Sequence, residues 1–233
     1  QPIFSFGQGC EGDPLINADL LAEAIKKYRQ MGGHGTINCN TNGSKPDAIP
    51  KLAKAGLTSM RVSMNSAQEK LYTRYYRCQS YSFHDVLESI RLAREENIFV
   101  SINLLFFPGL TDTEEELEAL ANLVGTNGVS MIQWRNLNVD PVWYYQIMTN
   151  YDLDVQQANF PNSNNNSLDE SNQIMQTTSM GLNAFMHRLR KLCPWLIYGY
   201  FNPWLDDHAK LTAPKVNTWH MPDWKKILTD TKE

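Results

Sequence analysis

The segment TSMRVSMN, residues 58–65, alternates between polar and apolar side chains. Its polar residues Arg61, Ser63 and Asn65 are two positions apart, and the residues between them are Val and Met. Because successive side chains of a β-strand point to opposite faces, this spacing predicts a strand with one polar and one apolar face.

The same alternation recurs in the segments 36–42, 98–107 and 131–136. Their polar positions are Asn38, Asn40, Asn42, Ser101, Asn103, Gln133 and Arg135. A parallel sheet covered by helices on both faces would instead be apolar almost throughout. The pattern therefore predicts neighbouring strands that share one polar face.

Amphipathic patterns predict helices between these strands, at about 18–30, 46–56, 83–96 and 113–124, and residues 3–7 fit an earlier strand. Strands that alternate with helices of this length are typical of βαβ units and a parallel sheet. The sequence predicts an α/β fold, a partial (β/α)6 TIM-like barrel with parallel strands. The apolar strand faces then meet the helices, and the polar faces line a lumen.

A polar lumen requires partners for its side chains, because each unsatisfied buried amide costs roughly 1–3 kcal/mol. The sequence therefore predicts a lumen that holds water and a polar ligand. An open sheet with one solvated face is the alternative.

Composition excludes several classes of protein. The chain has 233 residues, 42% of them hydrophobic, and a formal charge of −4, which argues against nucleic acid as the main partner. No uncharged run approaches the ~18 residues of a membrane span, and no signal peptide is visible. Four dispersed cysteines fit reduced thiols in a cytoplasmic protein. No nucleophile stands beside a base and no metal-ligand spacing occurs, so we predict neither catalytic side chains nor metal ligands in this chain.

The turn after the first strand, SFGQGCEGDPL at 5–15, is rich in glycine and acid. Glycines at the carboxyl end of a strand let the backbone approach a ligand closely, and parallel α/β folds bind ligands at this end. Glu11 and Asp13 are positioned to hold an ammonium group. A tight turn with two exposed acids is the alternative.

Four segments in this order resemble motifs of the radical S-adenosylmethionine (SAM) enzyme family. In CEGDPL, Gly12, Asp13 and Pro14 resemble the end of the family's Gly-Gly-Glu-Pro element, with Asp in place of Glu and Glu11 in place of the first Gly. The other three segments are NTNG at 40–43, SMRVSMNSA at 59–67 and FPGLTDTEEE at 107–116. The resemblance covers roughly residues 3 to 136.

The resemblance implies roles for particular residues. Gly12 and its neighbours, Glu11 among them, would bind the methionine amine of SAM through backbone carbonyls, with Asp13 in support. Backbone around Asn136 would lie near the adenine. Candidates for the SAM carboxylate and ribose are Asn42, Ser63, Asn65 and Asn103. Arg61 and Arg135 would balance a carboxylate or a substrate acid, and a lumenal salt bridge is the alternative for them.

The family's Cys-x3-Cys-x2-Cys segment, which holds a [4Fe-4S] cluster, has no counterpart in these residues. We therefore expect a core whose first βα unit is missing and which is inactive alone. In the intact protein the resemblance implies SAM, a cluster, a reductant such as flavodoxin or ferredoxin, and a small-molecule or peptide substrate. A cluster-less, non-catalytic scaffold and an unrelated TIM-barrel aldolase or isomerase are the alternatives.

The predicted organisation has four parts. Residues 1–149 form the partial barrel, and 150–171 form an Asn-rich loop. Residues 172–204 supply a helix and a strand that complete the barrel, and 205–233 form a docked tail. The strand at 3–7 is expected to leave an exposed parallel edge, which predicts low stability or edge pairing between chains.

Overall fold

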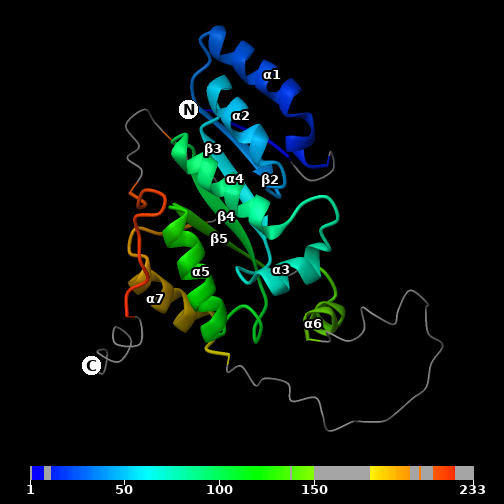
Figure 1. The fold of residues 1–233 in the computed structure, drawn as a ribbon, viewed down its shortest axis with the longest axis vertical. Coiled ribbons are helices and arrows are strands. Elements are labelled where there is room, and N and C mark those ends of the chain that lie inside the picture. Colours follow the sequence, from blue (N-terminus) through cyan, green and yellow to red (C-terminus); the bar gives the residue numbers. More distant parts are fainter. Residues whose placement is uncertain are drawn as a thin grey trace, which may run out of the picture.

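The computed structural model describes residues 2–7, 12–136, 138–149, 179–199, 205 and 212–223. Within them, six parallel strands form one sheet in the order of the sequence (Figure 1). The strands are β1 (Ile3–Phe6), β2 (Thr36–Thr41), β3 (Ser59–Met64), β4 (Phe99–Phe106), β5 (Met131–Asn136) and β6 (Ile197–Gly199). The predicted α/β fold with a parallel, partial-barrel sheet is confirmed.

Helices connect the strands. They are α1 (Ala18–Gln30), α2 (Ile49–Ala55), α3 (Glu69–Tyr76), α4 (Phe83–Glu95), α5 (Glu114–Thr126), α6 (Pro141–Thr149) and α7 (Leu182–Leu192), with short 3-10 turns η1 (Pro14–Asn17) and η2 (Pro46–Ala48). Ser82 caps α4 by accepting from the backbone N–H of Asp85, whose carboxylate accepts from the backbone N–H of Ser82. The predicted Asn-rich loop at 150–171 lies outside the described residues.

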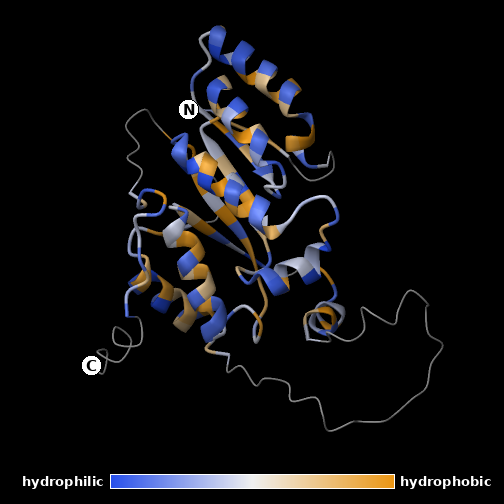
Figure 2. Ribbon diagram, viewed as in Figure 1, coloured by the Kyte–Doolittle hydropathy of each residue, from blue (hydrophilic) through white to orange (hydrophobic). Residues whose placement is uncertain are grey.

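The helices α1, α2, α4, α5 and α7 cover one face of the sheet (Figure 1). Each carries hydrophobic and hydrophilic residues side by side along its length (Figure 2). The apolar strand residues predicted to meet them are buried, Val62, Ile102 and Ile132 completely so. Burying a side chain of this size contributes roughly 1.5–3 kcal/mol, so this layer is the core of the fold.

The opposite face of the sheet, here called the lumenal face, carries the polar residues. Asn38 donates to Ser5 Oγ and Asn40 Oδ1, both at 2.9 Å, and accepts from Ser59 Oγ at 2.9 Å. Asn38, Ser101 and Gln133 are completely buried, which a solvated sheet face would not allow. The other polar residues of this face are only partly buried: Asn40, Arg61, Ser63, Asn103 and Arg135. The sheet is open, and its polar face is covered at the level of Asn38 and partly accessible toward the carboxyl ends of the strands.

The described part of the tail packs at the amino ends of the strands. The backbone N–H of Leu205 donates to Thr36 Oγ1 at 2.7 Å, and that of Asn217 donates to the carbonyl of Thr126 at 2.9 Å. Trp219 covers Gly125 so closely that an added Cβ would lie 2.2 Å from its ring. Leu205 therefore lies against the start of β2, and residues 217–219 pack on the end of α5.

The first strand forms an edge of the described sheet. β1 pairs with β2 along one side, and Ile3 and Phe4 are 41% and 43% exposed. Low stability or edge pairing between chains stays a prediction.

Candidate functional site

The carboxyl ends of the strands hold the first candidate element, the turn at Gly12 and Asp13. The Asp13 carboxylate accepts from Thr41 Oγ1 at 2.8 Å and from the backbone N–H groups of Asn42 and Leu15, at 2.6 and 3.0 Å. It therefore fastens the turn after β1 to the end of β2. Sequence reasoning placed Asp13 here but did not foresee that its oxygens are engaged by the protein.

Gly12 keeps the turn open. Its φ is +81°, in the left-handed region that favours glycine, and a Cβ added there would meet nothing within 4 Å. Gly7 differs, because a Cβ there would lie 2.2 Å from the carbonyl oxygen of Asn40. Packing requires Gly7, whereas Gly12 leaves its backbone accessible to a ligand. Glu11 lies outside the described residues.

Strand register aligns the lumenal side chains of neighbouring strands in rows across the sheet, here called levels. Arg61 on β3 is level with Asn40 on β2 and Ser101 on β4. One level further toward the carboxyl ends, Ser63, Asn103 and Gln133 are aligned. Four of the predicted polar candidates therefore occupy adjacent levels of one lumen: Arg61, Ser63, Asn103 and, one level higher, Arg135.

Arg135 reaches back across these levels. Its Nε donates to Asn103 Oδ1 at 2.7 Å and its Nη2 to Gln133 Oε1 at 3.1 Å. Burial lowers the pKa of Arg61, and the positive charge of Arg135 lowers it further. The two guanidinium groups thus share one region of the lumen.

Ser101 presents an unsatisfied group in the same region. Its hydroxyl is buried and finds no hydrogen-bond partner among the described residues. Buried polar atoms are nearly always paired, with protein, water or ligand, so this position suits a polar ligand or a water molecule.

Asn42, Asn65 and Asn136 have other surroundings. Asn42 Oδ1 accepts from the backbone N–H of Ser44 at 2.9 Å, within the turn after β2. Asn65 is completely buried, and its Nδ2 donates to the carbonyl of Leu71 at 3.1 Å and to Tyr144 Oη at 3.3 Å. Asn136 is exposed at the end of β5. Their roles toward SAM stay predictions.

Glu116 is a buried acid near the site that the sequence placed only within the predicted helix at 113–124. Its carboxylate is completely buried and accepts from Ser66 Oγ at 2.6 Å, the backbone N–H of Ala67 at 2.7 Å and Gln68 Nε2 at 2.9 Å. Burial raises its pKa to about 7, and the three hydrogen bonds limit the rise. Glu116 therefore holds the loop that follows β3.

The described cysteines do not fit a cluster. Cys39 and Cys193 are completely buried, and burial raises the pKa of both thiols to about 12. Among the residues that the structure describes, no three or more His, Cys, Asp and Glu side chains gather as metal ligands. Cys10 lies outside those residues.

SAM, in contrast, is compatible with the residues present. The open turn at Gly12 offers backbone atoms to an ammonium group. The amide of Asn103 and the unpaired hydroxyl of Ser101 offer hydrogen bonds to polar groups deeper in the lumen.

The fold and this site define a partial α/β barrel whose sheet has one polar face. The protein-family model of the radical SAM superfamily matches residues 5–124, about half of the chain. The chain belongs to the radical SAM superfamily.

Relatives and solved structures resemble parts of the chain. A probable GTP 3′,8-cyclase of Aeropyrum pernix is 27% identical over 104 residues, which are 44% of this chain and 28% of that protein. A domain of pyruvate-formate lyase-activating enzyme from Bacteroides vulgatus matches 64% of this chain and 93% of its own, with 15% identity and a TM-score of 0.46. The methyltransferase TsrM of Kitasatospora setae, solved with cobalamin and a [4Fe-4S] cluster, matches 51% of this chain and 24% of its own, with 19% identity and a TM-score of 0.40.

The family model, rather than these partial likenesses, carries the assignment. The chain spans little more than a quarter of the length of the cyclase. No helix in the described ranges is long and apolar enough to cross a membrane.

Proposed function

We propose that this chain forms the SAM-binding part of a radical SAM enzyme. The observation that carries the proposal is the turn at Gly12, open to a ligand and fastened by Asp13 at the edge of a polar lumen. The hydrogen bonds of Asp13 hold the end of this turn against β2, so that the backbone beside Gly12 can recognise an ammonium group with little reorganisation.

Several residues would hold SAM. The backbone around Gly12 receives the methionine amine, and Ser63 and Asn103 hydrogen-bond the carboxylate or the ribose hydroxyls. Asn42 and Asn65 act mainly through the loops that they stabilise. The backbone at Asn136 lies near the adenine.

A bound [4Fe-4S] cluster supplies the electron that cleaves SAM to a 5′-deoxyadenosyl radical in this family. The described cysteines do not fit that cluster, so we expect the 233-residue chain to bind SAM without cleaving it. The barrel's own contribution is to orient SAM and keep water from the lumen. Flavodoxin or ferredoxin is the proposed source of the electron, and free thiols at Cys39, Cys78 and Cys193 suit a cytoplasmic setting.

Gly12→Ala tests the proposal by calorimetric titration with SAM. A Cβ with its methyl hydrogens would enter the space over the turn, and we expect the Kd for SAM to rise at least tenfold. Gly32→Ala is the matched control, because Gly32 has a φ of +80° and the same open surroundings at the end of α1. It carries the same backbone strain and leaves SAM binding unchanged.

Two results would contradict the proposal. One is a wild-type chain that is folded and does not bind SAM. The other is an equal loss of affinity in both glycine variants, which would assign the effect to stability rather than to the site.

A further inference from the structure

One carboxylate fastens the loop after β3 to the first turn of α5. Glu116 Oε1 accepts from the backbone N–H of Ala67 at 2.7 Å, and its Oε2 accepts from Ser66 Oγ at 2.6 Å and from Gln68 Nε2 at 2.9 Å. Ser66 Oγ in turn accepts from the backbone N–H of Gln68 at 3.0 Å. Three consecutive loop residues therefore depend on the two oxygens of a completely buried side chain.

This loop continues directly from the end of β3 that faces the proposed SAM site. Ser63, a candidate for the SAM carboxylate or ribose, lies on the lumenal face near the last residue of β3. Asn65, the residue before the loop, donates to α3 and α6 and forms one anchor. Glu116 forms a second anchor from α5. A displacement of residues 66–68 is therefore transmitted to Ser63 through a few peptide bonds.

The contacts of Glu116 suit an ionised carboxylate, because all three of its partners are donors. A proton on Oε1 would face the N–H of Ala67. A proton on Oε2 would require the Ser66 hydroxyl to accept instead of donate, and Gln68 would lose its charged acceptor. Hydrogen bonds to a charged group are stronger than neutral ones, so protonation weakens the hold on the loop.

Both charge states of Glu116 are populated near neutral pH. Burial raises its pKa to about 7, and the hydrogen bonds from the loop limit the rise. The loop itself presents neutral groups to Glu116. From α6 it is faced by Tyr144, whose pKa is raised mainly by burial and also by the charge of Glu116. Asp112, on the turn before α5, has its own donors. The charged residues beside this contact in the sequences of α5 and α3 are exposed: Glu114, Glu115, Glu69 and Lys70.

We propose that Glu116 is a positioning residue for SAM: its carboxylate holds residues 66–68, and with them the end of β3, in the arrangement that binds SAM, and its protonation releases them. The inference deepens the proposed function and rests on it, because it assigns to the proposed SAM site a control by pH. The affinity for SAM therefore rises as Glu116 ionises, although Glu116 acts through the loop and Ser63 rather than by touching SAM.

The first measurement is the Kd for SAM, from calorimetric titration of the 233-residue chain at pH 6, 7 and 8. The variant is Glu116→Gln, which keeps the shape of the side chain and resembles its neutral form. Glu114→Gln is the matched control, because Glu114 lies in the same turn of α5, is exposed and pairs with Arg188. The Kd of each variant is divided by that of the wild type at the same pH, which cancels the ionisation of SAM itself.

The second measurement follows the loop without SAM. Hydrogen exchange at the Ala67 amide reports its hydrogen bond to Glu116, when the rate is expressed as protection relative to an unstructured chain at the same pH. Ser66→Ala removes a hydrogen bond that lowers the pKa of Glu116, so it should move the midpoint of the protection profile to higher pH. The wild-type profile requires no variant, so the inference remains testable if Glu116→Gln does not fold.

We expect the Kd ratio of Glu116→Gln to be close to one at pH 6 and to increase about tenfold by pH 8. A group with a pKa of about 7 is roughly one-tenth ionised at the lower pH and roughly nine-tenths ionised at the higher. The ratio of Glu114→Gln should stay constant. The protection of the Ala67 amide should rise over the same range in the wild type and remain constant in Glu116→Gln.

The opposite results separate this inference from the proposed function. If SAM binds and the Kd ratio of Glu116→Gln is the same at every pH, or changes equally in Glu114→Gln, the proposed function stands and the inference is wrong. Protection of Ala67 that does not depend on pH in the wild type also overturns it. If the protection depends on pH only when Glu116 is present while SAM does not bind at any pH, the proposed function fails, and the role of Glu116 toward SAM fails with it.

Discussion

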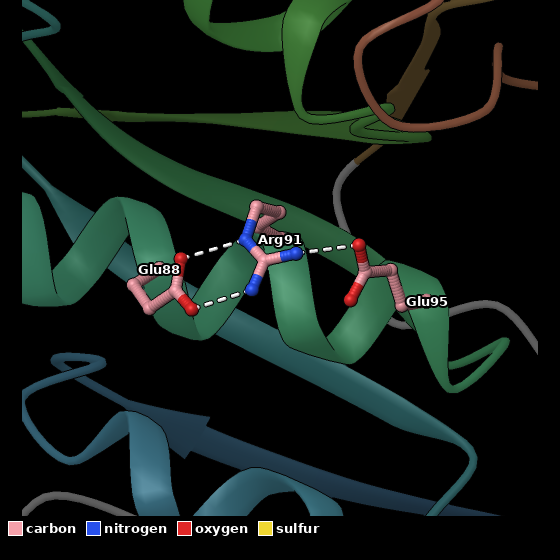
Figure 3. Close-up of polar contacts among 3 residues, drawn as sticks. All are labelled: Glu88, Arg91 and Glu95. Atoms are coloured by element: carbon pink, nitrogen blue, oxygen red, sulfur yellow. Dashed lines mark hydrogen bonds and ion pairs between the residues drawn. The ribbon is translucent and has the colours of Figure 1, made fainter.

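Glu116 and the Arg91 cluster on α4 show two different uses of charge in one molecule. Glu116 is completely buried, and its three donors come from the loop after β3. Arg91 lies on the helix surface, where it binds Glu88 through two hydrogen bonds and Glu95 through a third (Figure 3). The buried group connects segments 50 residues apart, whereas the surface cluster joins residues of one helix.

Asp13 and Asp112 resemble Glu116, because their carboxylates also accept hydrogen bonds from loop residues. Asp112 is completely buried and accepts from the backbone N–H groups of Gly109 and Gly181, at 2.6 and 3.1 Å, and from Ser179 Oγ at 2.6 Å. Each of the three acids fastens a loop near the carboxyl ends of the strands. The comparison teaches that these buried acids fix the positions of the loops around the site, whereas the surface cluster acts within one helix.

The largest expected effect is that of Asp13→Ala on stability. The substitution leaves the donors of Leu15, Thr41 and Asn42 without their charged acceptor, and we expect a loss of roughly 4 kcal/mol in the free energy of unfolding. Urea denaturation monitored by circular dichroism measures it. Asp19→Ala is the control, since Asp19 is 83% exposed and pairs with Lys51, and it should cost less than about 1 kcal/mol. Equal losses in the two variants would remove the distinction between buried and surface acids.

Glu116→Gln should change how stability depends on pH. The folded protein binds a proton on Glu116 with a pKa of about 7, against 4.5 for an ordinary glutamate. Stabilisation by this proton is fully present below pH 4.5 and is lost as the pH rises through about 7, a difference on the order of 3 kcal/mol.

The measurement is the wild-type free energy of unfolding minus that of Glu116→Gln, taken from urea denaturation between pH 4.5 and 8. Glutamine cannot titrate, so the variant lacks this contribution. The contributions of the other titratable groups are the same in both proteins and cancel in the difference. A difference that stays constant across the range, or rises with pH, would show that Glu116 is ionised in the folded protein throughout.

Asp112→Asn should destabilise the segment at 179–181 rather than the whole fold. The N–H groups of Gly109 and Gly181 donate to different oxygens of Asp112, so the single NH2 group of Asn leaves one of them facing a donor and gives the other a neutral acceptor. We expect the segment at 179–181 to loosen by roughly 2 kcal/mol. Hydrogen exchange should then accelerate about 30-fold at these two amides, with little change in the core strands. Uniform acceleration across the sheet would indicate that Asp112 supports the whole fold instead.

The sequence predicted the strands of the sheet and their polar faces, but not the hydrogen bonds of Asp13, Asp112 and Glu116. Alternation along 36–42 and 58–65 predicted which strand faces are polar, because strand geometry fixes side-chain direction within a few residues. Helix α3 is not among the helices predicted from the amphipathic pattern, although Tyr72 is completely buried and stacks on Tyr76.

The candidate site, too, could be predicted only in part from the sequence. Register places Arg61, Ser63 and Asn103 together as the alternation implies. The partners of Glu116 are instead 48–50 residues away, and the sequence placed Glu116 only within the predicted helix at 113–124. Contacts between distant loops depend on how the helices pack, which no local pattern encodes.

The smallest expected effect is that of Arg91→Ala, and its pH dependence should be opposite in sign to that of Glu116. The hydrogen bonds from Arg91 lower the pKa of Glu88 below 4.5, so any stabilisation is present above that pH and is lost as the pH falls. Solvent screens the cluster, whose Arg91 and Glu88 side chains are each 31% exposed, and we expect a loss of less than about 1 kcal/mol at pH 7. Urea denaturation at low salt and in 1 M salt, where the Debye length is about 3 Å, should show the loss shrinking toward zero. A larger, salt-independent loss would mean that the aliphatic part of Arg91 packs on α4, so that a surface cluster, too, contributes to the fold mainly through its contacts rather than its charge.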